Sequence, residues 1–206
     1  MEKPTLILDL DDTLIKPYSF TTNYIDILLE YCHSNKLDIC VKHPELYPIL
    51  LPYYNISFNK DYLFHFSKGN NTFIIYNRPY LFEFIKEAHK YFNIYIYSLG
   101  HQDYVDIIIN YIVSILEFNP FIKVFGNSNN DYKINKDLFR YNLPDDSLII
   151  DDRSDVWIID YKNVFKIKRY NNLYDDSELL FLMNKLKSFF LINSFNLKEL
   201  LNYIHK

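Results

Sequence analysis

Apolar residues recur along the second half of the chain with two different spacings. In residues 80–91 they lie three and four positions apart, which is typical of a helix with one buried face. Between such segments lie short, nearly continuous apolar runs that have the length of buried strands. The pattern predicts helices at residues 80–91, 102–116 and 136–141, and strands at residues 94–97, 122–125, 148–150 and 164–167.

The two ends of the chain show the same two kinds of pattern. Residues 5–10 form a short apolar run, which indicates a strand buried on both faces. Residues 23–32 have apolar positions at helical spacing. The tail at residues 176–206 is also helical in pattern, with a break expected at Asn193 and Ser194.

Residues 38–76 interrupt this regularity with prolines and short aromatic segments. Within them, residues 62–66 and 72–76 flank the turn-rich stretch SKGNN, which is a hairpin signal. Elsewhere, strands alternate with helices, and this order favours an α/β fold with a doubly wound parallel sheet between helices. We therefore expect a single domain over residues 1–206, with a β-rich insertion at 38–76 and a helical tail.

Composition and charge narrow the class of protein. With 206 residues, 49% of them hydrophobic, the chain can bury a well-packed core. A net charge of −4 gives no strong footprint for nucleic acid and no attraction to an anionic membrane. Two cysteines are too few for a disulfide framework, and no apolar run approaches the length of a membrane span. We expect a soluble, intracellular protein, in either nucleus or cytoplasm.

Acidic residues cluster where the predicted strands end. Asp9, Asp11 and Asp12 follow the first apolar run, and Asp151 and Asp152 follow a later one. In an open parallel sheet, ligands bind beyond the carboxyl ends of the strands. Neighbouring strands would bring these carboxylates together, and such a cluster requires a strong cation. Because all the ligands would be oxygen atoms, the sequence predicts Mg²⁺.

Such a site suits phosphoryl transfer. Asp9 could attack phosphorus to form an aspartyl-phosphate, and Asp11 could donate and later accept a proton. Ser98, at the end of another strand, and a lysine would hold the phosphoryl oxygens. Each aspartate taken alone could instead be a turn residue or a helix cap. Their conjunction at successive strand ends favours the catalytic interpretation.

Several stretches together resemble one family. DLDDTL fits the DxDxT signature of the haloacid dehalogenase superfamily. NRPYLFEFI, YIYSLGHQDYV, KDLFRYNLPDD and LIIDDRSDVW follow in the order found in phosphatases of the RNA polymerase II C-terminal domain. DDRSDVW is the most specific of these stretches and is similar to the TFIIF-associating subgroup. The resemblance covers roughly residues 5–170 and implies a haloacid dehalogenase-like fold.

The resemblance also implies a catalytic set. Asp9 would be the nucleophile and Asp11 the general acid/base, and Ser98 and Lys136 would act on the phosphoryl group. Asp9, the backbone carbonyl of Asp11 and the side chain of Asp152 would be the Mg²⁺ ligands. Lys133 is a rival for the role of Lys136, but it lacks the following Leu-x-Arg spacing.

Further residues would support the substrate. The resemblance implies that Thr13 and Leu99 lie on the phosphate or substrate side, and that Arg78 and Arg153 lie either there or behind the residues that contact the phosphate. It also implies that Asp151 orients the catalytic lysine.

Two departures from the family pattern concern the substrate. The family usually has threonine where this chain has Ser98, and the arginine expected before the catalytic lysine is missing from the stretch at residues 126–131. The resemblance implies a Mg²⁺-dependent phosphatase that acts on phosphoserine or phosphothreonine peptides, with the RNA polymerase II C-terminal repeat as expected substrate. The alternatives are a nucleotide or polynucleotide-end phosphatase of the same superfamily, and a non-catalytic phosphopeptide-binding scaffold.

Overall fold

The computed structural model describes residues 3–21, 63–128, 134–158, 162–171, 175–192 and 196–204. These residues belong to two compact units, Met1–Ile15 together with Arg78–Lys206, and Lys16–Asn77. The helix expected at residues 23–32 and the break expected at residues 193–194 lie outside the described residues.

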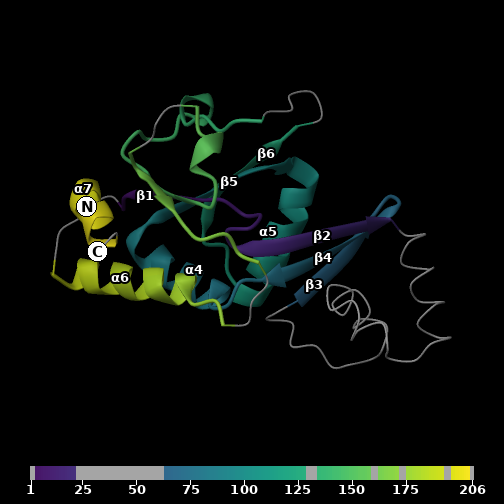
Figure 1. Cartoon of the computed structure of the whole chain (residues 1–206), viewed down its shortest axis with the longest axis horizontal. Coiled ribbons are helices and arrows are strands. Elements are labelled where there is room, and N and C mark those ends of the chain that lie inside the picture. Colours follow the sequence, from purple (N-terminus) through teal and green to yellow (C-terminus); the bar gives the residue numbers. More distant parts are fainter. Residues whose placement is uncertain are drawn as a thin grey trace. The chain divides into compact units, whose positions relative to one another are not determined.

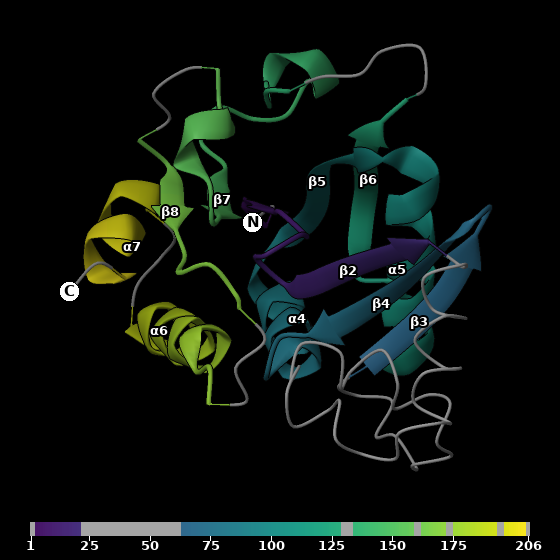
Figure 2. The ribbon, with the colours of Figure 1, turned by 45° about the vertical axis from the view of Figure 1, so that its right-hand side comes forward.

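A five-stranded sheet forms the centre of the first unit (Figure 1). All its paired strands are parallel, and their order is β6-β5-β1-β7-β8, so the first strand lies in the middle (Figure 2). The predicted parallel sheet is thus confirmed. Its strands are β1 (Thr5–Leu8), β5 (Asn93–His101), β6 (Phe121–Asn127), β7 (Leu148–Asp151) and β8 (Val164–Lys166).

Buried side chains on one face of the sheet hold the stretches on either side of β7, residues 134–147 and 152–158, against it. The cluster consists of Ile7, Tyr97 and Ile149 from the strands with Leu138, Leu143, Val156 and Trp157 from those stretches. Each fully buried aliphatic side chain of this kind contributes about 1.5–3 kcal/mol. Apolar packing therefore fixes the segment that carries Lys136.

Four described helices flank the sheet or one another. α5 has the predicted bounds, and its buried side chains recur on one face, as the pattern requires. α4 packs against α5 and α6, and α6 packs against α7, which confirms the helical C-terminal tail. The helices are α4 (Leu81–Tyr91), α5 (Gln102–Leu116), α6 (Glu178–Ile192) and α7 (Leu197–Ile204). Within the described stretches, no helix combines the length and apolarity needed to span a bilayer.

The helix predicted at residues 136–141 is wrong. Lys136 is extended and forms an isolated parallel bridge with Trp157, and only Phe139–Tyr141 make a short 3₁₀ turn, η3. A second 3₁₀ turn, η4, covers Ser154–Val156. The bridge replaces helical hydrogen bonds, because Lys136 N donates to Val156 O at 2.7 Å and Ile158 N donates to Lys136 O at 3.0 Å.

The second unit contains a three-stranded sheet of order β2-β4-β3. Its strands are β2 (Ile15–Thr21), β3 (Leu63–Lys68) and β4 (Asn71–Asn77). β3 and β4 pair antiparallel, which confirms the hairpin, but its loop is shorter than the predicted SKGNN. Only Gly69 and Asn70 separate the strands, and Gly69 has a φ of 59°, which glycine adopts without strain. β2 was not predicted.

Candidate active site

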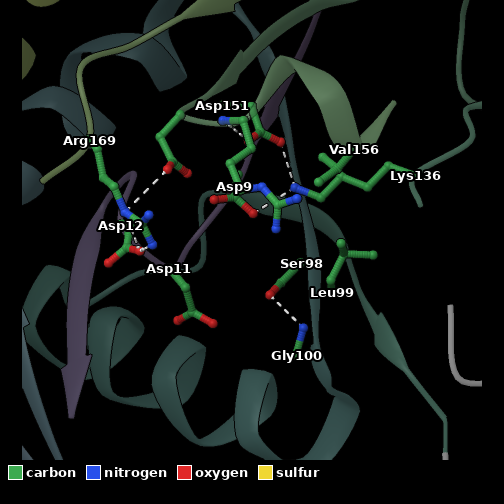
Figure 3. A pocket seen from close by; sticks show the side chains of 12 residues that line it. Asp9, Asp11, Asp12, Ser98, Leu99, Gly100, Lys136, Asp151, Val156 and Arg169 are labelled. Atoms are coloured by element: carbon green, nitrogen blue, oxygen red, sulfur yellow. Dashed lines mark hydrogen bonds and ion pairs between the residues drawn. The ribbon is translucent and has the colours of Figure 1, made fainter. Parts of the chain in front are cut away.

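The residues expected to carry chemistry lie at the carboxyl ends of three adjacent strands. Leu8 of β1 pairs with Ile96 of β5 and Ile150 of β7, so Asp9 follows between the ends of these strands. A pocket of about 280 Å³ lies there (Figure 3). It is lined by Asp9, Asp11, Asp12, Ser98, Leu99, Gly100, Lys136, Asp151, Asp152, Arg153, Val156 and Arg169. Of the predicted site residues, all but Thr13 and Arg78 line it.

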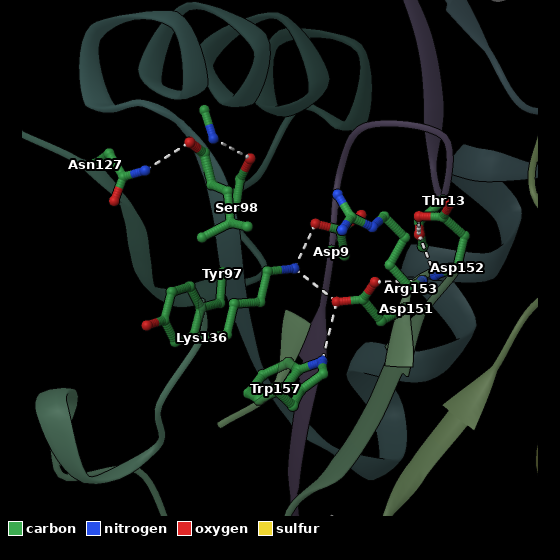
Figure 4. Close-up of polar contacts among 12 residues, drawn as sticks. Asp9, Thr13, Tyr97, Ser98, Asn127, Lys136, Asp151, Asp152, Arg153 and Trp157 are labelled. Carbon is green, nitrogen blue, oxygen red and sulfur yellow. Dashed lines mark hydrogen bonds and ion pairs between the residues drawn. The ribbon is translucent and has the colours of Figure 1, made fainter. Parts of the chain in front are cut away.

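Lys136 is the buried cation of this site. Its Nζ donates to Asp9 Oδ1 and to Asp151 Oδ2, at 2.6 Å in both cases (Figure 4). Burial disfavours the ammonium charge, but the two carboxylates outweigh burial and raise the pKa of Lys136. The lysine therefore stays charged beside Asp9. Its sequence rival, Lys133, lies outside the described residues.

Asp151 uses both of its carboxylate oxygens for protein contacts. Trp157 Nε1 donates to Asp151 Oδ2 at 3.1 Å, the oxygen that also accepts from Lys136. Arg153 N donates to Asp151 Oδ1 at 2.8 Å. These contacts fix the carboxylate, and the fixed carboxylate in turn directs the Lys136 ammonium towards Asp9.

The two aspartates of the DxD motif differ from ordinary surface carboxylates. Burial raises the pKa of Asp9 to about 7, with Lys136 opposing the rise and Asp151 adding to it. Burial also raises the pKa of Asp11 to about 6, against the lowering effect of a hydrogen bond from Tyr104. A carboxyl group with a pKa near neutrality can both give and take a proton at physiological pH. Asp11 thus has the acidity that a general acid/base requires.

Thr13 holds Asp152 from behind the pocket. The Thr13 hydroxyl donates to Asp152 Oδ1 at 3.2 Å and accepts from Asp152 N at 3.0 Å. The turn that places it runs through Asp12, whose φ of 64° lies in the left-handed region. Asp12 N donates to Ile15 O at 2.7 Å and closes the turn. The phosphate contact expected for Thr13 stays a prediction.

Three buried carboxylates could hold a metal ion. Asp9, Asp151 and Asp152 each offer an oxygen, and these oxygens lie within 4.8 Å of one another. An all-oxygen set of this kind fits Mg²⁺. Asp9 and Asp152 belong to the predicted ligand set, whereas Asp151 is already bound to Lys136 and Trp157. The third predicted ligand, the backbone carbonyl of Asp11, stays a prediction.

The end of β5 contributes Ser98 and Leu99. Ser98 Oγ accepts a hydrogen bond from Gly100 N at 3.0 Å, within the pocket. The Leu99 carbonyl accepts from Asn127 Nδ2 at 2.7 Å, and Asn127 is buried. Asn127 belongs to the stretch at residues 126–131, where the resemblance led us to expect an arginine. Its amide therefore supports the β5 turn and adds no charge to the pocket.

Two arginines lie at the rim of the pocket. Arg153 donates to Asp155 at 2.8 Å, and Arg169 donates through Nε to Asp12 Oδ2 at 2.7 Å. The side chains of Arg153 and Arg169 are 54% and 58% exposed. Sequence reasoning selected Arg153 but missed Arg169, which lies in a basic stretch outside the motifs that carry the family resemblance.

Arg78 does not line the pocket, and it contacts the backbone of Thr13, which lies outside the lining as well. Its guanidinium donates to both oxygens of Asp176 at 2.8 Å and to the carbonyls of Thr13 and Lys168 at 2.8 and 2.7 Å. The side chain is fully buried. Arg78 therefore ties the turn after β1 to the start of the C-terminal tail.

Tyr104 is a further residue that sequence reasoning missed. It lies in the first turns of α5, and its hydroxyl donates to Asp11 Oδ1 at 2.7 Å. Burial and the neighbouring Asp11 carboxylate raise the pKa of Tyr104, so the phenol stays protonated. The tyrosine itself is not part of the pocket lining.

Comparisons with known proteins show which proteins the chain resembles. The model of the NLI interacting factor-like phosphatase family matches residues 4–196, which is most of the chain. A search of curated proteins finds no significant match. The family assignment therefore rests on a match that includes every strand end described above.

Two solved structures share the fold. One is Fcp1, an essential RNA polymerase II CTD phosphatase, with a TM-score of 0.52 and 21% identity over 84% of this chain and 44% of that one. The other is the fission yeast Fcp1 in a variant bound to beryllium fluoride, with a TM-score of 0.52 and 21% identity over 96% and 48% of the two chains. This chain spans less than half the length of both.

Proposed function

The chain belongs to the NLI interacting factor-like phosphatase family, and on that premise we propose that it hydrolyses phosphoserine or phosphothreonine esters in proteins. The proposal includes a dependence on Mg²⁺ and an aspartyl-phosphate on Asp9. One observation carries it: the buried Asp9 lies in a pocket with Asp11 and contacts the Lys136 ammonium at 2.6 Å.

Asp9 is the nucleophile of the proposed first step. Its free oxygen attacks phosphorus, the bond from phosphorus to the ester oxygen breaks, and the proton of Asp11 passes to the departing oxygen. Lys136 favours the ionised form of Asp9 against the effect of burial and would face the negative charge that develops on the phosphoryl oxygens. Ser98 lines the same pocket and offers its hydroxyl to one of these oxygens.

The second step returns the protein to its starting state. Water attacks phosphorus of the aspartyl-phosphate, and Asp11, now ionised, takes the proton from that water. The bond between phosphorus and the Asp9 oxygen breaks, which releases inorganic phosphate. Asp11 is then protonated and Asp9 ionised, as at the start of the cycle.

Asp9 and Asp152 would hold the Mg²⁺ ion, with the carbonyl of Asp11 as a third ligand. When bound, the ion neutralises charge on the phosphoryl oxygens and offsets the repulsion between these carboxylates. Thr13 supports this arrangement, because its hydroxyl fixes both the backbone and the carboxylate of Asp152.

The proposed substrate is a phosphorylated polypeptide, with the RNA polymerase II C-terminal repeat as the first candidate. The fold shared with the CTD phosphatase Fcp1 supports this choice. The missing arginine near Asn127 leaves Arg153 and Arg169 at the rim to meet the anionic groups of such a peptide.

Phosphate release tests the proposal. Wild type and Asp9→Asn are compared on p-nitrophenyl phosphate and on singly phosphorylated heptad-repeat peptides, each with Mg²⁺ or EDTA. We expect release that requires Mg²⁺ and that vanishes in Asp9→Asn, because an amide cannot attack phosphorus. Faster release from the peptides than from the generic ester would support the polymerase substrate.

Other outcomes separate the alternatives. Release from nucleotides or polynucleotide ends, with none from peptides, would contradict the protein substrate and favour a nucleic-acid phosphatase. No release from any substrate, by folded wild type with Mg²⁺, would contradict the enzymatic role. Phosphopeptide binding that persists in Asp9→Asn would then identify a scaffold.

A further inference from the structure

Asp11 is held on one side by a tyrosine that does not touch the pocket. The Tyr104 hydroxyl donates to Asp11 Oδ1 at 2.7 Å across 93 residues of sequence. Asp11 lines the pocket and Tyr104 does not, so this hydrogen bond can act on a substrate only through Asp11. The residue is 9% exposed, and bulk water has little access to replace its contact.

The backbone near β5 makes room for this ring. A Cβ atom at Gly100 would lie 3.0 Å from Cδ1 of Tyr104, closer than side chains normally approach. Glycine at this position therefore lets the ring lie against the turn at the end of β5. α5 begins at Gln102, directly after this turn, so the ring is fixed at the start of a packed helix.

We propose that Tyr104 is a positioning residue for Asp11. Its hydrogen bond occupies one oxygen of the Asp11 carboxyl group, so that the other oxygen carries the proton that passes to the leaving group. A phenol that donates to Oδ1 makes that oxygen an acceptor, so the carboxylic proton resides on Oδ2. This inference rests on the proposed function, because it concerns proton transfer from Asp11 to the departing ester oxygen.

The bonds that form and break in this step show which part of it Tyr104 can affect. The bond from Asp9 oxygen to phosphorus forms, the bond from phosphorus to the ester oxygen breaks, and the Oδ2 proton of Asp11 moves to the departing oxygen. The Tyr104 proton stays on its phenol throughout. An alcohol or simple phenol leaves slowly without that proton, whereas the much more acidic p-nitrophenol leaves readily as an anion.

Leaving-group dependence therefore tests the proposal. Wild type and Tyr104→Phe are compared by kcat/KM, which reports the steps up to phosphoryl transfer to Asp9, on phenyl phosphate and on p-nitrophenyl phosphate. We expect Tyr104→Phe to lower kcat/KM for phenyl phosphate about tenfold or more, and for p-nitrophenyl phosphate less than about threefold, as for partial loss of general acid catalysis.

Two further variants sharpen the test. Tyr111→Phe removes a tyrosine hydroxyl from the same helix, outside the pocket, and should leave both rates unchanged. Asp11→Asn removes the proton donor itself, so adding Tyr104→Phe to it should not lower either rate further. A further loss in the double variant would show that the tyrosine acts elsewhere and would overturn the proposal.

The outcomes separate this proposal from the function on which it rests. If wild type hydrolyses neither ester, the proposed phosphatase activity fails and the inference fails with it. If wild type hydrolyses both and Tyr104→Phe slows them equally, or slows neither, only the positioning role is overturned. A selective loss on phenyl phosphate supports the role, because a merely structural defect would lower both rates together.

Discussion

The cations buried in and behind the pocket differ in their surroundings from the cations at its rim. Lys136 and Arg78 lie inside, with side chains 2% and 0% exposed, and every described contact of their charged groups is to the protein. Arg153 and Arg169 lie at the rim, where their side chains are 54% and 58% exposed. Buried charges depend on their partners, whereas water can replace the partner of an exposed charge.

This difference separates the residues that build the site from the residues that are available to a substrate. Lys136 fixes Asp9 against Asp151, and Arg78 fixes the Thr13 carbonyl against the tail. An anionic substrate cannot recruit Arg78 without unpairing the buried Asp176, whereas the Lys136 ammonium keeps a third N–H for a phosphoryl oxygen while both of its carboxylates stay paired. Arg153 can exchange its exposed partner Asp155 for phosphate at little cost, and the Arg169 side chain is itself exposed although its partner Asp12 is not, so we expect both arginines to affect binding more than folding.

The largest effect is expected for Lys136→Met. The change leaves Asp9 beside Asp151 without a cation, which raises the pKa of Asp9 further and removes the charge that faces the phosphoryl group. We expect kcat/KM to fall by about 10²–10³-fold, the range for loss of one such donor, or by more. Lys123→Met on β6 is the matched control, because Lys123 is exposed. Near-normal activity of Lys136→Met would contradict the interior role.

Arg78→Ala should affect stability most. It leaves Asp176 without the buried cation that pairs with it, together with two unsatisfied carbonyl oxygens. We expect the free energy of unfolding in urea to fall by about 3–5 kcal/mol, as for a broken buried ion pair. Arg78→Lys should recover only part of the loss, because an ammonium cannot reproduce the bidentate contact. A loss below about 1 kcal/mol would place Arg78 with the rim residues.

Arg169→Ala should weaken substrate binding with little effect on folding. Its guanidinium contacts Asp12 and lies 3.7 Å from Asp152 Oδ2, so it is the rim charge nearest the acidic cluster. We expect KM for a phosphopeptide to rise about 2–5-fold and the rise to shrink in high salt, because the Arg169 side chain is 58% exposed and its charge is screened there. Loss of kcat with unchanged KM would show that Arg169 belongs with the interior residues.

Arg153→Ala should give the smallest effect. Its side-chain partner is Asp155, which is 68% exposed, so both groups regain water when the pair is lost. We expect KM to change by about twofold at most and the free energy of unfolding by less than about 1 kcal/mol. Steady-state kinetics and urea unfolding of the same preparation measure both. If Arg153→Ala lowered the free energy of unfolding more than Arg78→Ala, the expected difference between buried and rim cations would be contradicted.

The sequence predicts the parallel sheet and α5 well, because burial repeats along the chain with a fixed period. Residues 102–116 bury one face, and the pattern predicts the bounds of α5. β2 was missed because Pro17 lies within it, and proline argues against a central strand. β2 is an edge strand of its sheet, where a missing backbone donor is tolerated.

Contacts between distant residues explain what the sequence could not predict. The stretch at residues 136–141 resembles a helix locally, but Lys136 pairs with Trp157 and becomes extended. The pocket residues that belong to sequence motifs could be predicted, because they come directly after successive strands. Tyr104 and Arg169 could not be predicted, because their partners Asp11 and Asp12 lie 93 and 157 residues away and no local pattern marks them.

The most direct test of the account is to trap the phosphoryl group on the protein. Wild type is mixed with a radiolabelled phosphoserine peptide and Mg²⁺, quenched rapidly in acid during turnover, and digested to locate the label. If Asp9 is the nucleophile, the label lies on the peptide that contains Asp9, is released by hydroxylamine as an acyl phosphate should be, and is absent from Asp9→Asn. Label on another residue, or label that persists in Asp9→Asn, would contradict the assignment of Asp9 as nucleophile.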